Sequence, residues 1–463
     1  MGISAAMDIG KNGLTIYRVA SEVTSENIAN VNTPGYSRQR VILETAPPTT
    51  ANGFPMGTGV RISSVERYYD GLLQNQLVNA QTKQGFDTAK STVLQQIEPT
   101  FNDVANDGLG AAISDFFGAW QDLTLNPAGV AERQAVMTRA NILSDNFHSA
   151  SKTLTDSITM QNDSLKPLTD DINATLKNIA ELNSQIKITE LVSGNANETR
   201  DQRDQLIRDL SGKIGITFTE NSDGTTDIKY ADGGASLVTG GSAGSFSLTV
   251  NVGTGLYDVN VTPPSGVTAV VAPATGELGA IIELRDTIIP GYLATLDTLA
   301  GNIASSVNTQ HNLGDDLSGT QGLDFFTVTA GSEASSIALD TTKITDTSKI
   351  AAASDGQPSG DSGNALVMAQ LASSNIVALG GTFSSYYTTL VSTVGLDVKS
   401  AKNVVAQDEA FTKQLDSLRE SNSGVSLDEE LTNLVKYQRS YQASAKLITT
   451  ATEMMDTVIG LVR

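Results

Sequence analysis

Apolar positions recur at one regular spacing along residues 426–463. From Leu427 onward, successive positions of this stripe are separated by alternating steps of four and three residues, and all but two of them are apolar. A period of 3.5 residues keeps one stripe facing a partner helix and is typical of a left-handed coiled coil. Ser426 stands three residues before Glu429, which is the capping-box pattern that opens a helix. The pattern predicts a long terminal helix whose seam packs on another helix, within a bundle or between subunits.

The first 30 residues carry two apolar stripes. One repeats every seven residues: Ile9, Ile16 and Val23. The other lies about 200° away around the same helix: Met7, Leu14 and Ile28. A helix that is apolar on two faces is buried between neighbours. We therefore expect the N-terminal helix to lie between other elements.

Turn residues end this first helix. The residue before Pro34 is biased to an extended conformation, and the pair Pro34-Gly35 suits a type II turn. We therefore expect the helix to end between Asn30 and Asn32 and the chain to reverse at Pro34 and Gly35.

Composition and charge narrow the class of protein. The 463 residues suffice for two to four domains, and 39% of them are hydrophobic. The formal net charge is −21, which argues against nucleic acid as a partner. Both terminal segments are nearly neutral, so the excess acid lies between them. Cysteine is absent, which excludes disulfides and thiolate metal sites.

The chain lacks the patterns of membrane proteins and of secreted precursors. No stretch approaches the roughly 18 apolar residues of a membrane span, so we predict no membrane insertion. Residues 1–8 have neither the basic start nor the apolar run of a secretory signal. We expect a cytoplasmic protein, or one that is exported by a route that removes no peptide.

The middle of the chain combines a helical body with a β insert. Helix formers dominate residues 66–211, where Pro167 is expected to interrupt a helical run. Residues 212–276 contain short β-branched runs separated by Asp-Gly and Gly-Gly turns, which predict a small antiparallel β domain. The predicted fold class is mainly α with an inserted β domain (α+β), with terminal helices in a coiled coil and a helical bundle as body. The predicted division is 1–65 (N-terminal helix and loop), 66–211 (helical body), 212–276 (β domain), 277–313 (helical return), 314–363 (irregular or β), 364–425 (helical body) and 426–463 (C-terminal helix).

Several motifs resemble those of a known family. Residues 27–39 (NIANVNTPGYSRQ) closely resemble the signature of flagellar axial proteins of the rod, hook and hook-filament junction. Residues 423–430 (SGVSLDEE) and 437–446 (YQRSYQASAK) resemble the matching C-terminal signature. Within that group, four further pieces look like the hook-associated protein 1 family: GYSRQ at 35–39, residues 126–135, DQRDQL at 201–206 and NTQH at 308–311. The resemblance covers about three quarters of the chain.

The resemblance implies a structural role in the bacterial flagellum. Members of the family are exported without a cleaved signal, are guarded by a chaperone at the C-terminal helix, and polymerise as the junction between hook and filament. The implied partners are further copies of the chain, the hook protein, a second hook-associated junction protein and the export chaperone, and the implied location is extracellular. The candidate partner-binding residues are Ile9, Leu14, Ile16, Val23, Ile28, Asn30, Pro34, Gly35, Tyr36, Leu427, Leu431, Leu434, Tyr441, Ile448, Met455, Ile459 and Val462.

The sequence leaves two alternatives to this role. An enzyme is disfavoured because the two histidines, His148 and His311, lack a second ligand at metal-site spacing, and Ser149-x-x-Lys152 lacks the companion motifs of a serine-lysine nucleophile. We therefore predict no enzymatic activity, cofactor or metal. The other alternative is a different axial protein: a hook subunit, a distal rod subunit or the second junction protein. Hook proteins usually have a β-rich middle directly after the N-terminal signature, whereas here largely helical residues 36–211 intervene, which favours the junction protein.

Overall fold

The structure is a computed structural model that describes residues 3–51, 54–101, 108–192 and 194–461. The chain divides into two compact units, and each is described here by itself. Unit 1 comprises Met1–Gly85, Pro167–Gly276 and Gln407–Arg463, and unit 2 comprises Phe86–Lys166 and Glu277–Ala406. Three of the four boundaries fall within long helices, which therefore contribute to both units: α2 (Gly71–Ile97), α4 (Val130–Val192) and α10 (Phe383–Ser423).

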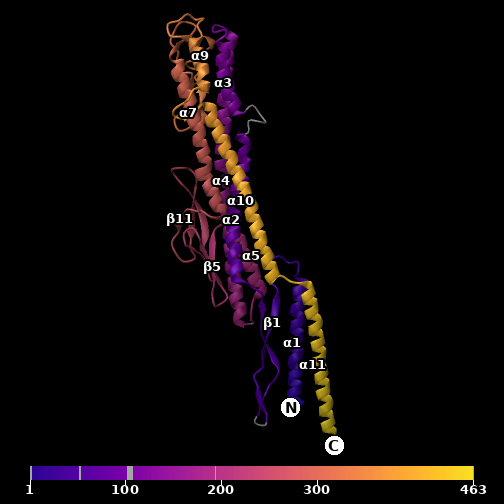
Figure 1. Ribbon diagram of the computed structural model, residues 1–463. Helices are drawn as coiled ribbons and strands as arrows, with labels where there is room; N and C mark the ends of the chain where they lie inside the picture. Colours follow the sequence, from indigo (N-terminus) through magenta and orange to yellow (C-terminus); the bar gives the residue numbers. More distant parts are fainter. Residues whose placement is uncertain (1–2, 52–53, 102–107, 193, 462–463) are drawn as a thin grey trace. The chain divides into compact units, whose positions relative to one another are not determined.

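The terminal helices of unit 1 pack against each other. Helix α1 (Ile3–Ala29) and helix α11 (Leu427–Leu461) run antiparallel, so both chain ends lie at the same end of the pair (Figure 1). The ring of Tyr17 in α1 stacks on that of Tyr437 in α11, with ring centroids 6.4 Å apart. An antiparallel pair of this kind covers part of the predicted seam within one chain.

A β-hairpin flanks α1 as a second neighbour. Strands β1 (Gln39–Thr45) and β4 (Val60–Arg67) pair antiparallel, and β2 (Thr49–Ala51) pairs with β3 (Phe54–Met56) beyond them. Both β1 and β4 contact α1. Helix α1 therefore lies between α11 and the hairpin, which confirms the expectation from its two apolar stripes. The hairpin itself was missed, although alternating residues in 39–45 and 60–67 carry its signal.

The β insert of unit 1 contains two antiparallel sheets. The first has the order β5-β6-β7-β8 and the second the order β11-β10-β9. Asn183 of α4 fixes the first sheet, because its Nδ2 donates to the carbonyl oxygens of Thr226 (2.8 Å) and Gly240 (2.7 Å). Asn173 of α4 likewise exchanges two hydrogen bonds with the backbone of Phe246 in β9. The strands are β5 (Ile216–Glu220), β6 (Thr226–Tyr230), β7 (Ser236–Thr239), β8 (Ser242–Ala243), β9 (Ser245–Val250), β10 (Tyr257–Thr262) and β11 (Ala269–Val271). This confirms the predicted fold class, mainly α with small antiparallel sheets.

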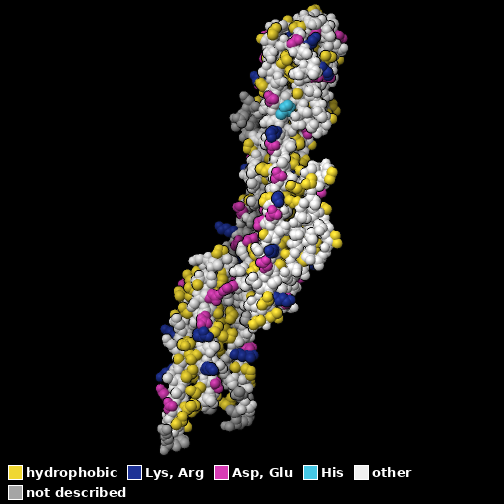
Figure 2. Space-filling model, turned by 180° about the vertical axis from the view of Figure 1, so that it is seen from behind, with side chains coloured by type: hydrophobic (Ala, Val, Ile, Leu, Met, Phe, Trp, Pro, Cys, Tyr) yellow, Lys and Arg dark blue, Asp and Glu magenta, His cyan; other side chains and the backbone are white. Residues whose placement is uncertain are grey.

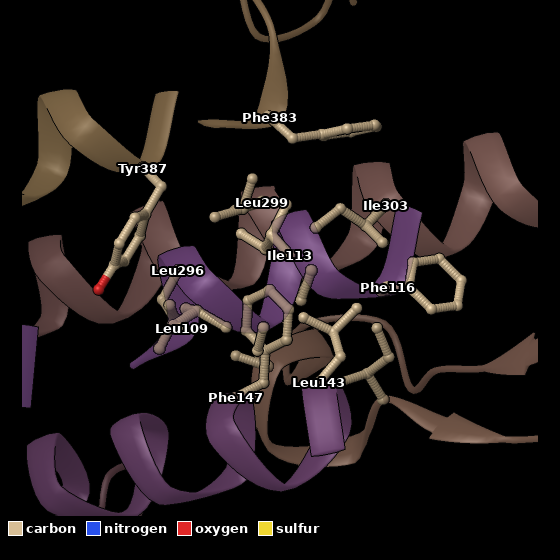
Figure 3. Close-up of a cluster of buried hydrophobic side chains, with 14 of the residues drawn as sticks. Leu109, Ile113, Phe116, Leu143, Phe147, Leu296, Leu299, Ile303, Phe383 and Tyr387 are labelled. Atoms are coloured by element: carbon tan, nitrogen blue, oxygen red, sulfur yellow. The ribbon is translucent and has the colours of Figure 1, made fainter. Parts of the chain in front are cut away.

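Unit 2 is built around one large apolar core. Side chains from α3 (Leu109–Leu123), α4, α7 (Ile289–His311) and α10 converge there (Figure 3). Trp120, the only tryptophan, is fully buried, and the ring of Phe117 stacks on that of Phe383 with centroids 5.6 Å apart. Helix α6 (Gly276–Glu283) and a π-helical turn (Leu284–Ile288) precede α7. Each large apolar side chain buried here contributes about 1.5–3 kcal/mol.

His311 organises the irregular segment that follows α7. Its Nε2 accepts a hydrogen bond from the backbone N–H of Ala351 (2.9 Å), so Nδ1 carries the proton and donates to the carbonyl of Leu323 (2.5 Å). This histidine therefore ties the end of α7 to two later parts of the chain. The remaining elements are short: 3₁₀ turns at Glu98–Phe101, Thr347–Lys349 and Leu371–Ser373, β12 (Gly314–Asp315), β13 (Phe326–Thr327), α8 (Glu333–Ser336), β14 (Ala338–Leu339), β15 (Ala353–Ser354) and α9 (Gly363–Gln370).

Two expectations about helix boundaries were wrong. Pro167 does not interrupt the helical run, because α4 continues through it from Val130 to Val192. A proline removes one backbone donor from a helix, and the other hydrogen bonds of a helix this long maintain it. The pair Asn126-Pro127 predicts a helix that starts at Pro127, but α4 begins three residues later, after a turn in which the Gly129 N–H donates to the Asn126 carbonyl (2.9 Å).

Candidate functional site: the terminal helix pair and the signature network

Glycines in α1 bring the terminal helices close together. A Cβ atom at Gly10 would lie 2.6 Å from Cγ1 of Ile448, and one at Gly13 would lie 2.7 Å from Oγ of Ser444. Both distances are shorter than real Cβ contacts, so a larger residue at either position would force a side chain of α11 to shift. Of the predicted seam on α11, Leu434, Ile448 and Met455 are half-buried, and Ile448 contacts α1 at Gly10.

Much of the predicted seam on α11 is left uncovered by α1. Leu431 is 51% exposed and Ile459 is 57% exposed, and Leu427 and Tyr441 are exposed as well. Val462 lies outside the described residues. Further exposed apolar side chains, which the seam pattern did not include, flank it: Val435, Leu447, Met454, Val458 and Leu461. Figure 2 shows hydrophobic side chains at the surface along this pair of helices. The apolar surface of α11 is thus wider than one partner helix covers.

The predicted residues of α1 are mostly covered. Ile16 and Val23 are buried, whereas Ile9, Leu14 and Ile28 are half-buried. Ile9 packs near the turn before β4, where a Cβ at Gly59 would lie 3.6 Å from its side chain. The apolar stripe of α1 is therefore buried within the single chain to a greater extent than the stripe of α11.

The loop after α1 makes the predicted turn. Gly35 has φ +83°, and the N–H of Tyr36 donates to the carbonyl of Thr33 (3.2 Å), as a type II turn requires. Asn30 is half-buried and Pro34 is exposed. The hydroxyl of Tyr36 donates back to Oδ1 of Asn27 (2.9 Å), which closes the loop onto α1.

Glu430, in the first turn of α11, holds this loop. Its side chain is only 2% exposed, and it accepts hydrogen bonds from Nδ2 of Asn27 (3.0 Å) and Nε of Arg38 (2.7 Å). Arg38 also pairs with Glu429 (2.6 Å). Burial would lower the pKa of Arg38, and these two carboxylates outweigh that effect and raise it. The N-terminal loop and the start of α11 thus form one charged cluster.

The end of α10 contacts the same loop from the C-terminal side. Nη2 of Arg419 donates to the carbonyl of Gly35 (2.8 Å), and the N–H of Arg38 donates to the carbonyl of Ser423 (2.8 Å). Two hydrogen bonds therefore join the loop to the end of α10, one from the side chain of Arg419 and one from the backbone of Arg38.

Helix α5 (Asn197–Lys213) completes the arrangement. Oδ2 of Asp201 accepts from the N–H of Ser37 (2.7 Å), and its Oδ1 accepts from Arg67 of β4 (2.6 Å), which also pairs with Asp204 (2.7 Å). Burial lowers the pKa of Arg67, but Asp204 and Asp201 overcome this and raise it, so the arginine stays charged. We call the connected residues the signature network: Asn27, Tyr36, Ser37, Arg38, Gln39, Arg67, Asp201, Asp204, Arg419, Ser423, Glu429 and Glu430.

The signature network joins motifs that are far apart in the sequence. Most of its members come from the segments 27–39, 201–206 and 423–430, whereas Arg67 and Arg419 lie outside these segments. Of these network residues, only Tyr36 was named as a candidate site residue. The signal that could have found the others is the presence of charged and amide side chains inside those motifs.

Two carboxyl groups meet at the end of α1. Glu26 forms a hydrogen bond with Glu198, at the start of α5, and this bond together with burial and the nearby charge raises the pKa of Glu26 to about 7. The Glu26 carboxyl therefore keeps its proton to a much higher pH than an ordinary glutamate does.

The described residues contain neither a metal-binding cluster nor a membrane-spanning helix. Within the described ranges, no group of three or more His, Cys, Asp and Glu side chains is arranged to hold a metal ion. No helix among them is long and apolar enough to span a membrane. The arrangement consists of a helix pair with uncovered apolar surface and a polar cluster that anchors it.

Comparison with known proteins identifies the family. Residues 94–326, half of the chain, match the model of the flagellar hook-associated protein FlgK helical domain. The chain belongs to the FlgK family. Outside the FlgK helical domain, residues 7–36 match the flagella basal body rod protein family, and residues 419–461 match the C-terminal family of the flagellar basal body rod proteins FlgEFG.

Individual relatives agree with the family match. Flagellar hook-associated protein 1 of Bacillus subtilis is 29% identical over 98% of this chain and 97% of the relative. The Escherichia coli protein of the same name is also 29% identical, over 99% of this chain and 100% of the relative. The structure of the flagellar hook junction protein FlgK from Burkholderia pseudomallei matches with a TM-score of 0.67 and 18% identity, covering 75% of this chain and 100% of that one, which supports a shared fold. The chain is thus a flagellar structural protein of the FlgK family.

Proposed function

We propose that this protein polymerises as the junction between hook and filament and that the filament cannot assemble without it. One observation supports this proposal above the others: α11 presents apolar side chains, such as Leu431 and Ile459, that the single chain leaves exposed. Exposed apolar surface of this extent marks an interaction surface. The name hook-associated protein 1, borne by the relatives in Bacillus subtilis and Escherichia coli, supports its placement at the hook.

The proposal includes specific partners. We infer self-assembly through the uncovered side of α11, with the hook protein and the second hook-associated junction protein as neighbours in the axial structure. We also propose that an export chaperone covers α11 before assembly and that export leaves no cleaved signal peptide. A chaperone on α11 is supported by the same exposed side chains, because a free apolar helix face aggregates unless it is covered.

The proposed role is structural and not enzymatic. The signature network explains its buried charges as partners of one another: Asp201 and Asp204 pair with Arg67, and Glu430 pairs with Arg38. None of these groups requires a substrate to account for its burial. Another axial position, in the hook, the distal rod or the second junction, is the alternative, and the FlgK helical-domain match over residues 94–326 favours the hook-associated protein.

Electron microscopy of a deletion strain tests the proposal. Cells that lack this chain should carry hooks without filaments and should release flagellin into the medium, and the wild-type gene should restore filaments. Immunogold labelling of a tagged chain should place it as a band between hook and filament. Normal filaments in the deletion strain, or label along the hook, would contradict the proposal.

A further inference from the structure

A groove lies beside the loop that follows α1. It has a volume of about 620 Å³, and it is walled by that loop, by α5 and by the part of α4 that belongs to unit 1. Tyr36 lines it from the loop, Glu198 from α5 and Glu181 from α4. Grooves of this size accept a small ligand or a protein segment.

The groove combines apolar surface with negative charge. Half-buried Leu182 and Leu206 supply part of its lining, and its carboxylates are those of Glu181, Glu198 and Asp201, with no Lys or Arg among the lining residues. Asp201 is neutralised by Arg67. Glu181 forms an exposed ion pair with Lys177 (3.8 Å), whereas Glu198 has another carboxyl group, that of Glu26, as its hydrogen-bond partner and has no cation partner among the described residues.

The segment of α11 from Leu431 to Thr452 contains cations and no carboxylate, and Asp428 and Glu453 lie beyond its two ends. Lys436, Arg439 and Lys446 are separated by steps of three and seven residues, which places them on one side of the helix. That side points away from Leu434 and Ile448, which are half-buried. All three cations are exposed, and none forms an ion pair with another described residue. Between them lies the exposed small side chain of Ala443.

We propose that the groove receives the basic side of α11 from a second copy of this chain. A helix whose outward side carries a small residue among cations fits a groove with apolar lining and carboxylates, which is the helix-in-groove mode of recognition. The occupant comes from another copy because the basic side of a chain's own α11 makes no described contact with its own groove. This inference rests on the proposed self-assembly and adds a defined contact to it.

Charge complementarity favours α11 of a second copy as the occupant of the groove. Each copy carries both an acidic groove and a row of cations. Repeated head-to-tail contacts of this kind build a closed ring or an open helical array of identical subunits.

Cysteine cross-linking tests the contact in assembled flagella. Because the chain has no cysteine, an engineered thiol is unique. Two differently tagged variants, Glu198→Cys and Arg439→Cys, are co-expressed in the deletion strain, so that a disulfide joining both tags arises only between copies. Gln185→Cys serves as a second groove position. Thr457→Cys is the matched control, because Thr457 is exposed and lies 18 residues after Arg439 on the same side of α11.

The expected result is a heterodimer band for Arg439→Cys with either groove variant, at least tenfold stronger than with Thr457→Cys. Arg439→Glu should reduce incorporation at the junction at least tenfold, and Glu198→Lys alone should also reduce it. The two changes together should restore incorporation. Normal flagella with no cross-link, or equal cross-linking with Thr457→Cys, would overturn this contact and leave the junction function standing. Absence of the wild-type chain from the junction would instead overturn the proposed function.

Discussion

Asn27 and Glu430 lie 403 residues apart in the chain, yet Nδ2 of Asn27 donates a hydrogen bond of 3.0 Å to Oε2 of Glu430. Asn27 is 1% exposed, and its Oδ1 also accepts hydrogen bonds from the N–H of Gln39 (2.9 Å) and the hydroxyl of Tyr36 (2.9 Å). A single amide therefore connects α1, the turn that follows it and the first turn of α11. The two ends of the chain are held together by polar groups at one end of the helix pair and by apolar contacts along its length.

Glu430→Gln should loosen the helix pair. The substitution keeps the shape of the side chain but leaves Arg38 without its buried carboxylate, and breaking a buried ion pair costs about 3–5 kcal/mol. Amide hydrogen exchange across α1 and the first two turns of α11 should accelerate. Glu429→Gln is the control, because its side chain is 62% exposed, and an exposed pair contributes about 0–1 kcal/mol. Equal effects from both variants would show that the burial of Glu430 is unimportant.

Aspartate substitutions should separate folding from assembly. Leu434→Asp with Ile448→Asp places two charges against α1, at several kcal/mol each, so the helix pair should open in the isolated chain. Leu431→Asp with Ile459→Asp changes exposed positions, so the isolated chain should keep its circular dichroism while losing incorporation at the junction. Filaments should be absent in both strains. If the second variant swims normally, the exposed stripe is not an assembly surface.

Gly13→Val should force the terminal helices apart. Its side chain would overlap Ser444, whose Oγ already lies 2.7 Å from a Cβ position at Gly13. We expect a loss of about 1–3 kcal/mol in the stability of the helix pair, measured by hydrogen exchange. Gly460→Ala is the matched control in α11, because nothing lies within 4 Å of its Cβ position, and it should stabilise the helix by up to about 1 kcal/mol. A Gly13→Val variant with unchanged stability would contradict the close approach of α1 and α11.

The stability of unit 2 should fall as the medium becomes acidic. Burial lowers the pKa of His311 to about 4, whereas an unfolded histidine titrates near 6.5. Between these values the unfolded chain binds more protons, so the free energy of unfolding should decrease as the pH falls from about 6.5 to about 4, by on the order of 3 kcal/mol in all. Urea unfolding followed by the fluorescence of Trp120, whose ring lies 6.1 Å from that of His311, reports this change. His311→Gln should be less stable at neutral pH and should lack this part of the pH dependence.

The contact between α1 and α5 should respond to pH in the opposite direction. The pKa of Glu26 is raised to about 7, so the folded chain binds more protons than the unfolded chain between pH 4.5 and 7. This contact therefore contributes fully to the stability of the fold below about pH 4.5, and its contribution is lost as the pH rises through 7. Hydrogen exchange at residues 22–30, corrected for the intrinsic rate, should show weaker protection at pH 8 than at pH 6. Glu26→Gln should remove the difference, and a difference that survives this variant would assign it to another group.

Local patterns were sufficient for the terminal helices and the turn between α1 and β1. The start of α11 next to Ser426 follows from the periodicity of its own sequence, and the reversal at Gly35 follows from the conformational freedom of glycine after proline. Pro167 shows the limit of such reasoning, because α4 continues through a residue that favours a break. The interactions of a long helix with its neighbours outweigh the loss of one hydrogen bond.

The candidate site was predictable only in part. Ile448 and Leu431 are equivalent in the seam pattern, but Ile448 lies against α1 while Leu431 is 51% exposed. The sequence period does not say how much of a wide apolar stripe one partner covers. The signature network was not predicted as a cluster for a similar reason, since Arg67 and Asp201 are 134 positions apart and only the fold places them 2.6 Å from each other.

The sequence by itself determined that both ends of this chain are helices with apolar stripes, that a turn follows the first helix, and that a small β insert interrupts a helical body. These features depend on side-chain periodicity and on the conformations of Gly and Pro, which act over a few neighbouring residues. Only the tertiary structure decided that α1 is enclosed by α11 and a hairpin, that Glu430 meets Asn27 and Arg38, and that one side of α11 stays uncovered. Burial and ion pairing depend on distances between segments hundreds of residues apart, and no local pattern encodes those distances.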